Sequence, residues 1–216
     1  MRVNTGMKMG LVTGLAFLAA GCTQILPIGS KAERSFSLRY ELAQDQYHGS
    51  GMKAGPVIFL DDPLLAEGLG GRTITVELEG RERTALKGAK WSAPLSDLIR
   101  GYLNRNLMAN TQAQIVGEGG LDVHASCRIS SKVWSFELHP QGEDGHEEDR
   151  VHVSLDLSLI DMRSGDLIGR NQFDNWSQLD ATDGRAVVAA FHEAMEPVAT
   201  DIAAWVTDNL KECSGG

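Results

Sequence analysis

Hydrophobic and polar residues alternate along several stretches of this chain, which is the pattern of β-strands with one buried face. The clearest alternation runs through residues 36–42, 73–79 and 150–161. Residues 56–60 form a short apolar run, which is typical of a more fully buried strand. Residues 83–87 and 167–173 follow two of these stretches closely and are expected to pair with them as further strands.

One alternating stretch changes phase part-way along. Odd-numbered positions over residues 121–129 carry apolar or small side chains, whereas the apolar Trp134, Phe136 and Leu138 occupy even-numbered positions. Because side chains of a strand alternate between its two faces, one extra residue moves every later side chain to the opposite face. The phase change therefore predicts a β-bulge near Val133.

Two segments have the three- and four-residue spacing of apolar positions that is typical of amphipathic helices. The first lies within residues 90–107, where Ser92 is a candidate N-cap and Pro94 is tolerated in the first turn. The second follows its own candidate N-cap, Asp183, and continues almost to the C-terminus. Pro197 predicts a kink in it, because the proline ring clashes with the carbonyl group four residues earlier.

The order of these elements predicts the fold class. Strands are followed by a helix, three further strands and a second helix. The last three strands are joined by an acidic connection at residues 139–149 and a tight turn at residues 163–166, which favours antiparallel pairing. Since each helix has one apolar face, both are expected to cover the same face of the sheet. The sequence thus predicts a single α+β domain, a two-layer sandwich of a mostly antiparallel sheet and two main helices.

The N-terminal segment has the pattern of a secretory signal peptide. Arg2 and Lys8 precede an apolar or small stretch that runs from Met9 to Ala20. About 12 such residues are too few to span a bilayer, which needs roughly 20. The stretch leads into Gly21 and Cys22, and this junction resembles the lipobox of bacterial lipoproteins.

The lipobox resemblance implies covalent lipidation of Cys22. A diacylglyceryl thioether forms on its sulfur, the chain is cleaved after Gly21, and the new α-amine is acylated with a fatty acid such as palmitate. Two or more acyl chains anchor a protein stably where one does not. Thr23 favours the outer membrane by the sorting rule of enterobacteria. We therefore expect a signal peptide over residues 1–21, a lipidated N-terminus and tether over 22–34, and one periplasmic domain over 35–212.

Composition limits the classes of partner. The chain of 216 residues has a formal net charge of −9 and no cluster of Lys and Arg, so nucleic acid is not an expected partner. An anionic membrane surface would not attract such a domain by charge either, so the lipid must hold it there. Hydrophobic residues make up 42% of the chain, which indicates a folded core rather than disorder.

The sequence lacks the local signatures of common catalytic and nucleotide-binding sites. It contains no G-x-S-x-G nucleophile elbow, and the GLGG segment at residues 68–71 lacks the rest of a phosphate-binding loop. We therefore predict no enzyme activity, no catalytic residue and no cofactor other than the acyl chains on Cys22.

Three histidines, His139, His146 and His152, lie near a run of acidic residues at positions 143–149. Imidazole and carboxylate groups can bind a divalent metal, but this spacing matches no known set of ligands. We interpret the segment as a solvated hairpin tip and predict no metal site. The four tryptophans are expected at core or rim positions, and they are Trp91, Trp134, Trp176 and Trp205.

Two further cysteines, Cys127 and Cys213, remain after the lipidated one. An oxidising compartment outside the cytoplasm allows a disulfide between them. Their separation in sequence does not show whether they approach each other, and Cys127 lies on an apolar strand face where a lone thiol also packs well. Both interpretations stay open at this stage.

Motifs spread along most of the mature chain carry a family resemblance. They are the lipobox at Cys22, FSLRY (36–40), KWSAPL (90–95), VWSFEL (133–138) and FDNWSQL (173–179). Taken together and in this order, they resemble the ABC-type transport auxiliary lipoproteins of the paraquat-inducible protein C type. Within KWSAPL, the resemblance assigns Trp91, Pro94 and Leu95 to the motif that starts a helix, where they are expected to pack it against the sheet.

The family resemblance implies a role in transport. Such lipoproteins are partners of ABC transporters that carry MCE-domain proteins and move phospholipids or other hydrophobic molecules between two membranes. The resemblance implies a lipid-anchored protein of the outer membrane that faces the periplasm and docks on an MCE-domain protein. The alternative is a carrier that itself holds the lipid in a cleft between helices and sheet. The sequence leaves the cargo and the formation of a homo-oligomer open.

Overall fold

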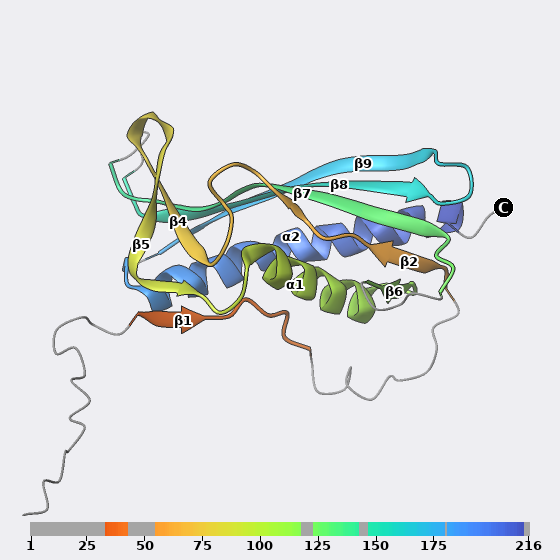
Figure 1. Ribbon diagram of the computed structural model, residues 1–216, viewed down its shortest axis with the longest axis horizontal. Helices are drawn as coiled ribbons and strands as arrows, with labels where there is room; N and C mark the ends of the chain where they lie inside the picture. Colours follow the sequence, from red (N-terminus) through yellow and green to blue (C-terminus); the bar gives the residue numbers. More distant parts are fainter. Residues whose placement is uncertain (1–32, 43–54, 118–122, 143–146, 180, 214–216) are drawn as a thin grey trace, which may run out of the picture. The chain divides into compact units, whose positions relative to one another are not determined.

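The computed structural model describes residues 33–42, 55–117, 123–142, 147–179 and 181–213 (Figure 1). The expected signal peptide, Cys22 and most of the tether lie outside these residues. The strands are β1 (Arg34–Phe36), β2 (Val57–Leu60), β3 (Leu64–Leu65), β4 (Thr73–Leu78), β5 (Glu82–Trp91), β6 (Gln114–Val116), β7 (Cys127–His139), β8 (Arg150–Asp161) and β9 (Leu167–Gln178). The helices are α1 (Leu95–Asn110) and α2 (Gly184–Cys213).

Strand β7 is the centre of a nine-stranded sheet formed by the described residues. One edge of β7 pairs with β8 in antiparallel orientation, and β8 pairs with β9 in the same way. The other edge is shared by three shorter strands, β2, β3 and β4, which all run parallel to β7. Strand β5 pairs antiparallel with β4, while β1 and β6 extend the sheet beside β5 and β2 in parallel orientation.

The predicted α+β class is confirmed. Figure 1 shows α1 and α2 together on one side of the sheet, and α2 packs on β8 and β9. The three long strands β7, β8 and β9 are antiparallel as the sequence predicted. The parallel pairings were not predicted, because they join segments far apart in sequence and hydrophobic periodicity carries no information on partners of that kind.

The predicted bulge lies at Trp134. The register between β7 and β8 shifts between Val133 and Ser135. Val133 and Phe136 are both fully buried, whereas Trp134 is 41% exposed. Trp134 is therefore the extra residue of the bulge. Its even position had suggested that it shares the buried face of Phe136 and Leu138, and this expectation was wrong.

The core joins the two layers through an aromatic group. Trp91 from β5, Phe136 from β7 and Phe191 from α2 are all almost completely buried. The ring centroid of Trp91 lies 5.9 Å from that of Phe136 and 5.6 Å from that of Phe191. The rings of Phe136 and Phe191 are stacked with centroids 4.4 Å apart. These contacts hold the sheet against α2 over a large apolar area.

Helix α1 begins later than predicted, because β5 continues to Trp91. The expected side-chain cap by Ser92 is absent among the contacts of this described segment, and Pro94 occupies the N-cap position. The backbone N–H of Ser92 donates instead to the carbonyl of Phe36, at 2.6 Å. The N–H of Leu95 donates to the carbonyl of Gly71, at 2.9 Å, so a neighbouring turn satisfies the first helical N–H.

Helix α2 begins at the predicted cap. The carboxylate of Asp183 accepts a hydrogen bond from the backbone N–H of Arg185 at 2.8 Å, and its carbonyl accepts one from Val187 at 3.1 Å. The helix then runs through Pro197 to Cys213 as one element.

A disulfide joins Cys127, the first residue of β7, to Cys213, the last residue of α2. Their Cα atoms lie 5.5 Å apart, and both side chains are buried. The bond fixes the C-terminal end of α2 to the central strand of the sheet.

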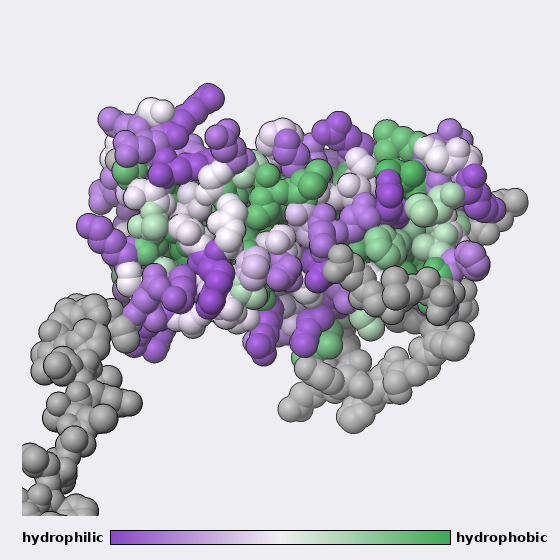
Figure 2. All heavy atoms as spheres, viewed as in Figure 1, coloured by the Kyte–Doolittle hydropathy of each residue, from purple (hydrophilic) through white to green (hydrophobic). Residues whose placement is uncertain are grey.

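The two ends of the unit differ in surface character. Figure 2 shows hydrophilic side chains around the end that holds the β4–β5 hairpin and more hydrophobic side chains toward the opposite end. That opposite end includes the exposed side chains of Val123, Met162 and Leu167, beside the start of β7 and the β8–β9 turn.

Candidate functional site

The bulge in β7 places three polar side chains on the face of the sheet that points away from the helices, called the outer face below. After Trp134, the core-facing positions are Phe136 and Leu138. Because side chains alternate along a strand, the residues on either side of these positions point to the outer face. These residues are Ser135, Glu137 and His139.

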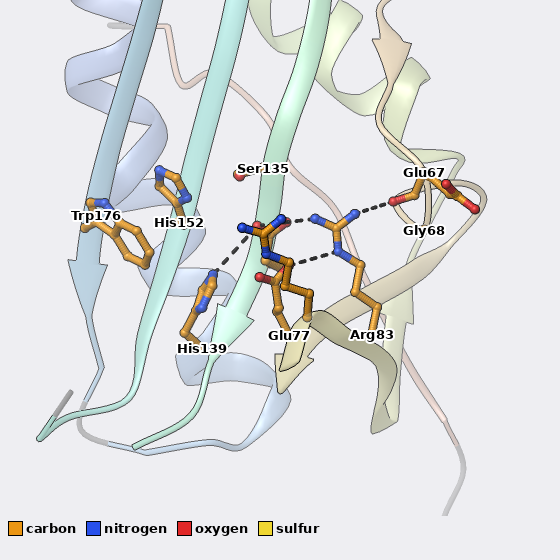
Figure 3. A pocket seen from close by; sticks show the side chains of 10 residues that line it. Glu67, Gly68, Glu77, Arg83, Ser135, His139, His152 and Trp176 are labelled. Atoms are coloured by element: carbon orange, nitrogen blue, oxygen red, sulfur yellow. Dashed lines mark hydrogen bonds and ion pairs between the residues drawn. The ribbon is translucent and has the colours of Figure 1, made fainter. Parts of the chain in front are cut away.

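The strands beside β7 extend this polar set across the sheet. Glu137 pairs with His152 on β8, and His152 pairs with Trp176 on β9. On the other side, Glu77 of β4 and Arg83 of β5 form a cross-strand pair next to Glu137. The residues line a groove of about 710 Å³, called the Glu137 groove below (Figure 3).

Glu137 is 1% exposed and has several polar partners. Its Oε2 accepts a hydrogen bond from the backbone N–H of Phe136 at 2.7 Å. Its Oε1 lies 3.7 Å from Nε2 of His139 and 3.9 Å from Nη2 of Arg83. A carboxylate this deeply buried is stable only with such partners, because it has lost its contact with water.

The partners also determine the charge of Glu137. Burial raises the pKa of its carboxyl group, but the polar contact with His139, the hydrogen bond from Phe136, the neighbouring Ser135 and the charge of Arg83 outweigh burial. The net result is a pKa below the ordinary value for glutamate. Glu137 therefore carries its negative charge at neutral pH.

Arg83 is held mainly by groups other than Glu137. Its Nε donates to Oε2 of Glu77 at 3.0 Å, and its Nη1 donates to the carbonyl of Glu67, as Figure 3 shows. Gly68 has a positive φ of +83°, and a Cβ at this position would lie 2.9 Å from Cδ of Arg83. Glycine is thus required both by the turn and by the close approach of the arginine.

An aromatic side chain forms the other wall of the groove. The rings of His152 and Trp176 are stacked, with centroids 3.8 Å apart and planes 2° from parallel. The ring centroids of His139 and Trp176 lie 5.0 Å apart. The guanidinium carbon of Arg150 lies 3.7 Å from the centroid of the Trp176 ring. Burial lowers the pKa of His152 and outweighs the charge of Glu137, so this imidazole is neutral at pH 7.

The groove is therefore suited to a polar or charged group rather than to an apolar molecule. Its walls combine a buried carboxylate, two imidazole rings and two arginines. Imidazole and carboxylate groups are also the common protein ligands of transition metals.

Comparison with known proteins places the chain in a family. Residues 36–203 match the sequence model of the ABC-type transport auxiliary lipoprotein component family. The chain belongs to this family. The match begins at the FSLRY segment and covers more than half of the chain, including most of α2. A search among curated proteins finds no match to the sequence.

Solved structures share the fold of this auxiliary lipoprotein. Protein XCC0632 of Xanthomonas campestris, from family DUF330, superposes with a TM-score of 0.71 at 16% identity, over 85% of this chain and 99% of that one. The hypothetical protein CT253 of Chlamydia trachomatis superposes with a TM-score of 0.51 at 10% identity, over 73% of this chain and 98% of that one. At these identities the similarity shows the fold alone.

The family is an auxiliary component of transport and not a known enzyme family. Within the described ranges, neither helix combines the length and the apolar character needed to cross a bilayer. The expected lipid attachment residue, Cys22, lies outside those ranges.

The three residues of the family's helix-start motif differ in burial. Trp91 and Leu95 are buried in the core, next to the first turn of α1. Pro94 is exposed at the N-cap, so its expected packing role is wrong.

The structure changes the interpretation of the histidines. His139 is 5% exposed and lies on β7, and His152 lies part-buried on β8, so neither belongs to a solvated hairpin tip. His146 lies outside the described residues. Glu137, the buried acid beside both histidines, was not among the predicted site residues. The signal that could have revealed it was the bulge itself, because it puts Glu137 and His139 on the same outer face.

The tryptophans divide between the core and the surface. Trp91 is fully buried, and Trp205 is partly buried beside Phe173, with ring centroids 5.9 Å apart. Trp134 and Trp176 are more exposed, and Trp176 forms a wall of the groove rather than part of the core.

Proposed function

We propose that this auxiliary lipoprotein is a lipid-anchored accessory of an MCE-type ABC transport system. Such a system moves phospholipids or other hydrophobic molecules between the inner and outer membranes. The observation that carries the proposal is the family match over residues 36–203. In this proposal the acyl chains on Cys22 hold the protein at the outer membrane, and the folded unit faces the periplasm and docks on the MCE-domain protein.

The disulfide supports a location outside the cytoplasm. Disulfides form and persist in oxidising compartments such as the bacterial periplasm and are rare in the cytosol. The bond between Cys127 and Cys213 is buried and connects two major elements of the fold. A protein that relies on this bond is suited to the periplasm.

The surface supports a docking role. Val123, Met162 and Leu167 are apolar and exposed at one end of the unit. Exposed apolar residues that gather in one place are typical of surfaces that contact another protein. Docking needs a folded surface and an anchor but no reacting groups.

The alternative function is a carrier that holds the transported lipid itself. Binding of an acyl chain requires a mostly apolar cavity. The Glu137 groove instead has charged walls, formed by Glu77, Arg83 and Glu137 among others, which favours the docking accessory. Native mass spectrometry of the protein distinguishes the two functions, because a stoichiometric lipid bound in addition to the covalent acyl chains would favour the carrier.

The anchor is tested by Cys22→Ala. We expect the unchanged protein to fractionate with the outer membrane and the variant to remain an unlipidated precursor that does not. Cys127→Ala with Cys213→Ala is the matched control, because it removes the other two cysteines and leaves the lipidation residue in place. If Cys22→Ala still fractionated with the outer membrane, the proposed anchoring would be wrong.

A further inference from the structure

Glu137, His139 and His152 bring three potential ligand atoms close together on the outer face. One carboxylate oxygen and one nitrogen from each imidazole all lie within 4.8 Å of one another. The strands dictate this arrangement: Glu137 and His139 are two residues apart on β7, and Glu137 pairs directly with His152 on β8. All three side chains belong to regular strands rather than to a loop.

The type and spacing of these ligands fit a transition metal. Two imidazoles and one carboxylate are preferred by zinc and its neighbours over calcium or magnesium, which favour oxygen ligands. Tetrahedral ligands about 2.1 Å from a zinc ion are roughly 3.4 Å apart. The distance from Oε1 of Glu137 to Nε2 of His139 is 3.7 Å, so small side-chain rotations bring them to that spacing.

We propose that Glu137, His139 and His152 bind one divalent transition-metal ion of the zinc type, with the remaining coordination position open to the Glu137 groove. The proposal is independent of the transport role, because it depends only on the geometry of these three residues.

The charges around the site are compatible with a cation. Arg83 lies 3.9 Å from Oε1 of Glu137, but it keeps Glu77 and the carbonyl of Glu67 as partners when Glu137 turns to a metal. Arg150, stacked on Trp176, is a second positive charge that acts on His152. Asp174 adds negative charge at the rim, with a carboxylate oxygen 4.0 Å from Nε2 of His152. The arginines lower the affinity of the site, and the carboxylates raise it.

Neighbouring groups hold the ligands in place. The face of Trp176 fixes the plane of the His152 ring, and the N–H of Phe136 holds one oxygen of Glu137. Such contacts orient metal ligands and commonly change affinity by 10–100-fold when they are removed. The groove of about 710 Å³ gives an ion access from solvent to a site whose Glu137 and His139 are otherwise buried.

The test is isothermal titration of zinc chloride into the full-length protein in detergent, stripped of metal by a chelator and carrying no histidine tag. We expect one zinc per chain. His139→Gln and His152→Gln should each weaken binding by roughly tenfold or more. The exposed His124 supplies the matched control, and His124→Gln should bind as the unchanged protein does.

Circular dichroism of each variant confirms that it is folded. His152 is only part-buried, so His152→Gln keeps the test decisive if the buried His139→Gln does not fold. Cobalt gives a second readout, because four-coordinate cobalt absorbs visible light and this absorption should be lost with His152→Gln. No binding of zinc by the unchanged protein, or equal binding by folded His152→Gln, would overturn the proposal.

Discussion

Glu137 and His152 face each other across β7 and β8 on the outer face of the sheet, and the bulge at Trp134 is what puts Glu137 there. Before the bulge, odd-numbered residues of β7 such as Ile129 and Val133 point into the core. An unbroken strand would turn Glu137 in the same direction and bury its charge among apolar side chains. The bulge thus converts a potentially costly core residue into a member of a polar groove.

The partners of Glu137 predict a measurable contribution to stability. Glu137→Gln removes charge-assisted hydrogen bonds to a buried group and should lower the free energy of unfolding by about 1–3 kcal/mol. The exposed Glu82 on β5 is the matched control, and Glu82→Gln should change it by less than about 0.5 kcal/mol. Urea denaturation without added metal measures both. Equal stability of the two variants would contradict the network around Glu137.

Trp91 should contribute far more to stability than Trp134. Trp91→Ala empties a fully buried site beside the stacked rings of Phe136 and Phe191 and should cost about 3–5 kcal/mol. Trp134→Ala removes an exposed bulge residue and should cost under about 1 kcal/mol. Thermal melting compares them. An unchanged melting temperature for Trp91→Ala would refute its place in the core.

The disulfide should stabilise the fold through the unfolded chain. It closes a loop across a sequence separation of 86 residues, and a native disulfide of this kind contributes about 2–5 kcal/mol. Replacing both Cys127 and Cys213 by Ala should lower the urea midpoint by the corresponding amount. A reducing agent should lower the midpoint of the unchanged protein and leave that of the double variant unaffected. If the reducing agent also lowered the urea midpoint of the double variant, its effect would not come from this disulfide.

Tyr102 should make the fold sensitive to alkali. Burial, followed by the charges of Glu196 and Tyr40, raises the pKa of its phenol from 10.0 to about 12. The folded state therefore favours the neutral phenol, so its contribution is complete below pH 10 and is lost as the pH rises toward 12. The loss amounts to about 3 kcal/mol. Tyr102→Phe should show a flatter decline in urea stability between pH 10 and 12, and an equally steep decline would contradict this origin.

The sequence predicted local structure better than it predicted which distant segments contact each other. The alternation in β8 and the stripe of α2 are local signals, and Asp183 caps α2 as its position indicated. The phase change in β7 even revealed the bulge. The start of α1 was wrong because the carbonyl of Gly71, distant in sequence, satisfies the N–H of Leu95 in place of a cap by Ser92.

The candidate site was missed for a related reason. The charges of the acidic run near His146 are adjacent in sequence and therefore form a local signal, whereas Glu137 is a single acid within an apolar strand. Its relation to His152 depends on the register between two strands, and its relation to Arg83 depends on a parallel pairing of β4 with β7. Neither follows from the spacing of residues along the chain.

Photo-crosslinking in living cells tests the central claim, that this lipoprotein docks on the MCE-domain protein of an ABC transport system. A photoreactive amino acid would replace Leu167, at the exposed apolar end, or Trp134, on the outer face. We predict that light links at least one of these positions to the MCE-domain protein, and that Cys22→Ala sharply reduces the adduct. Absence of any adduct with a component of the transport system, from both positions in folded, anchored protein, would contradict the account.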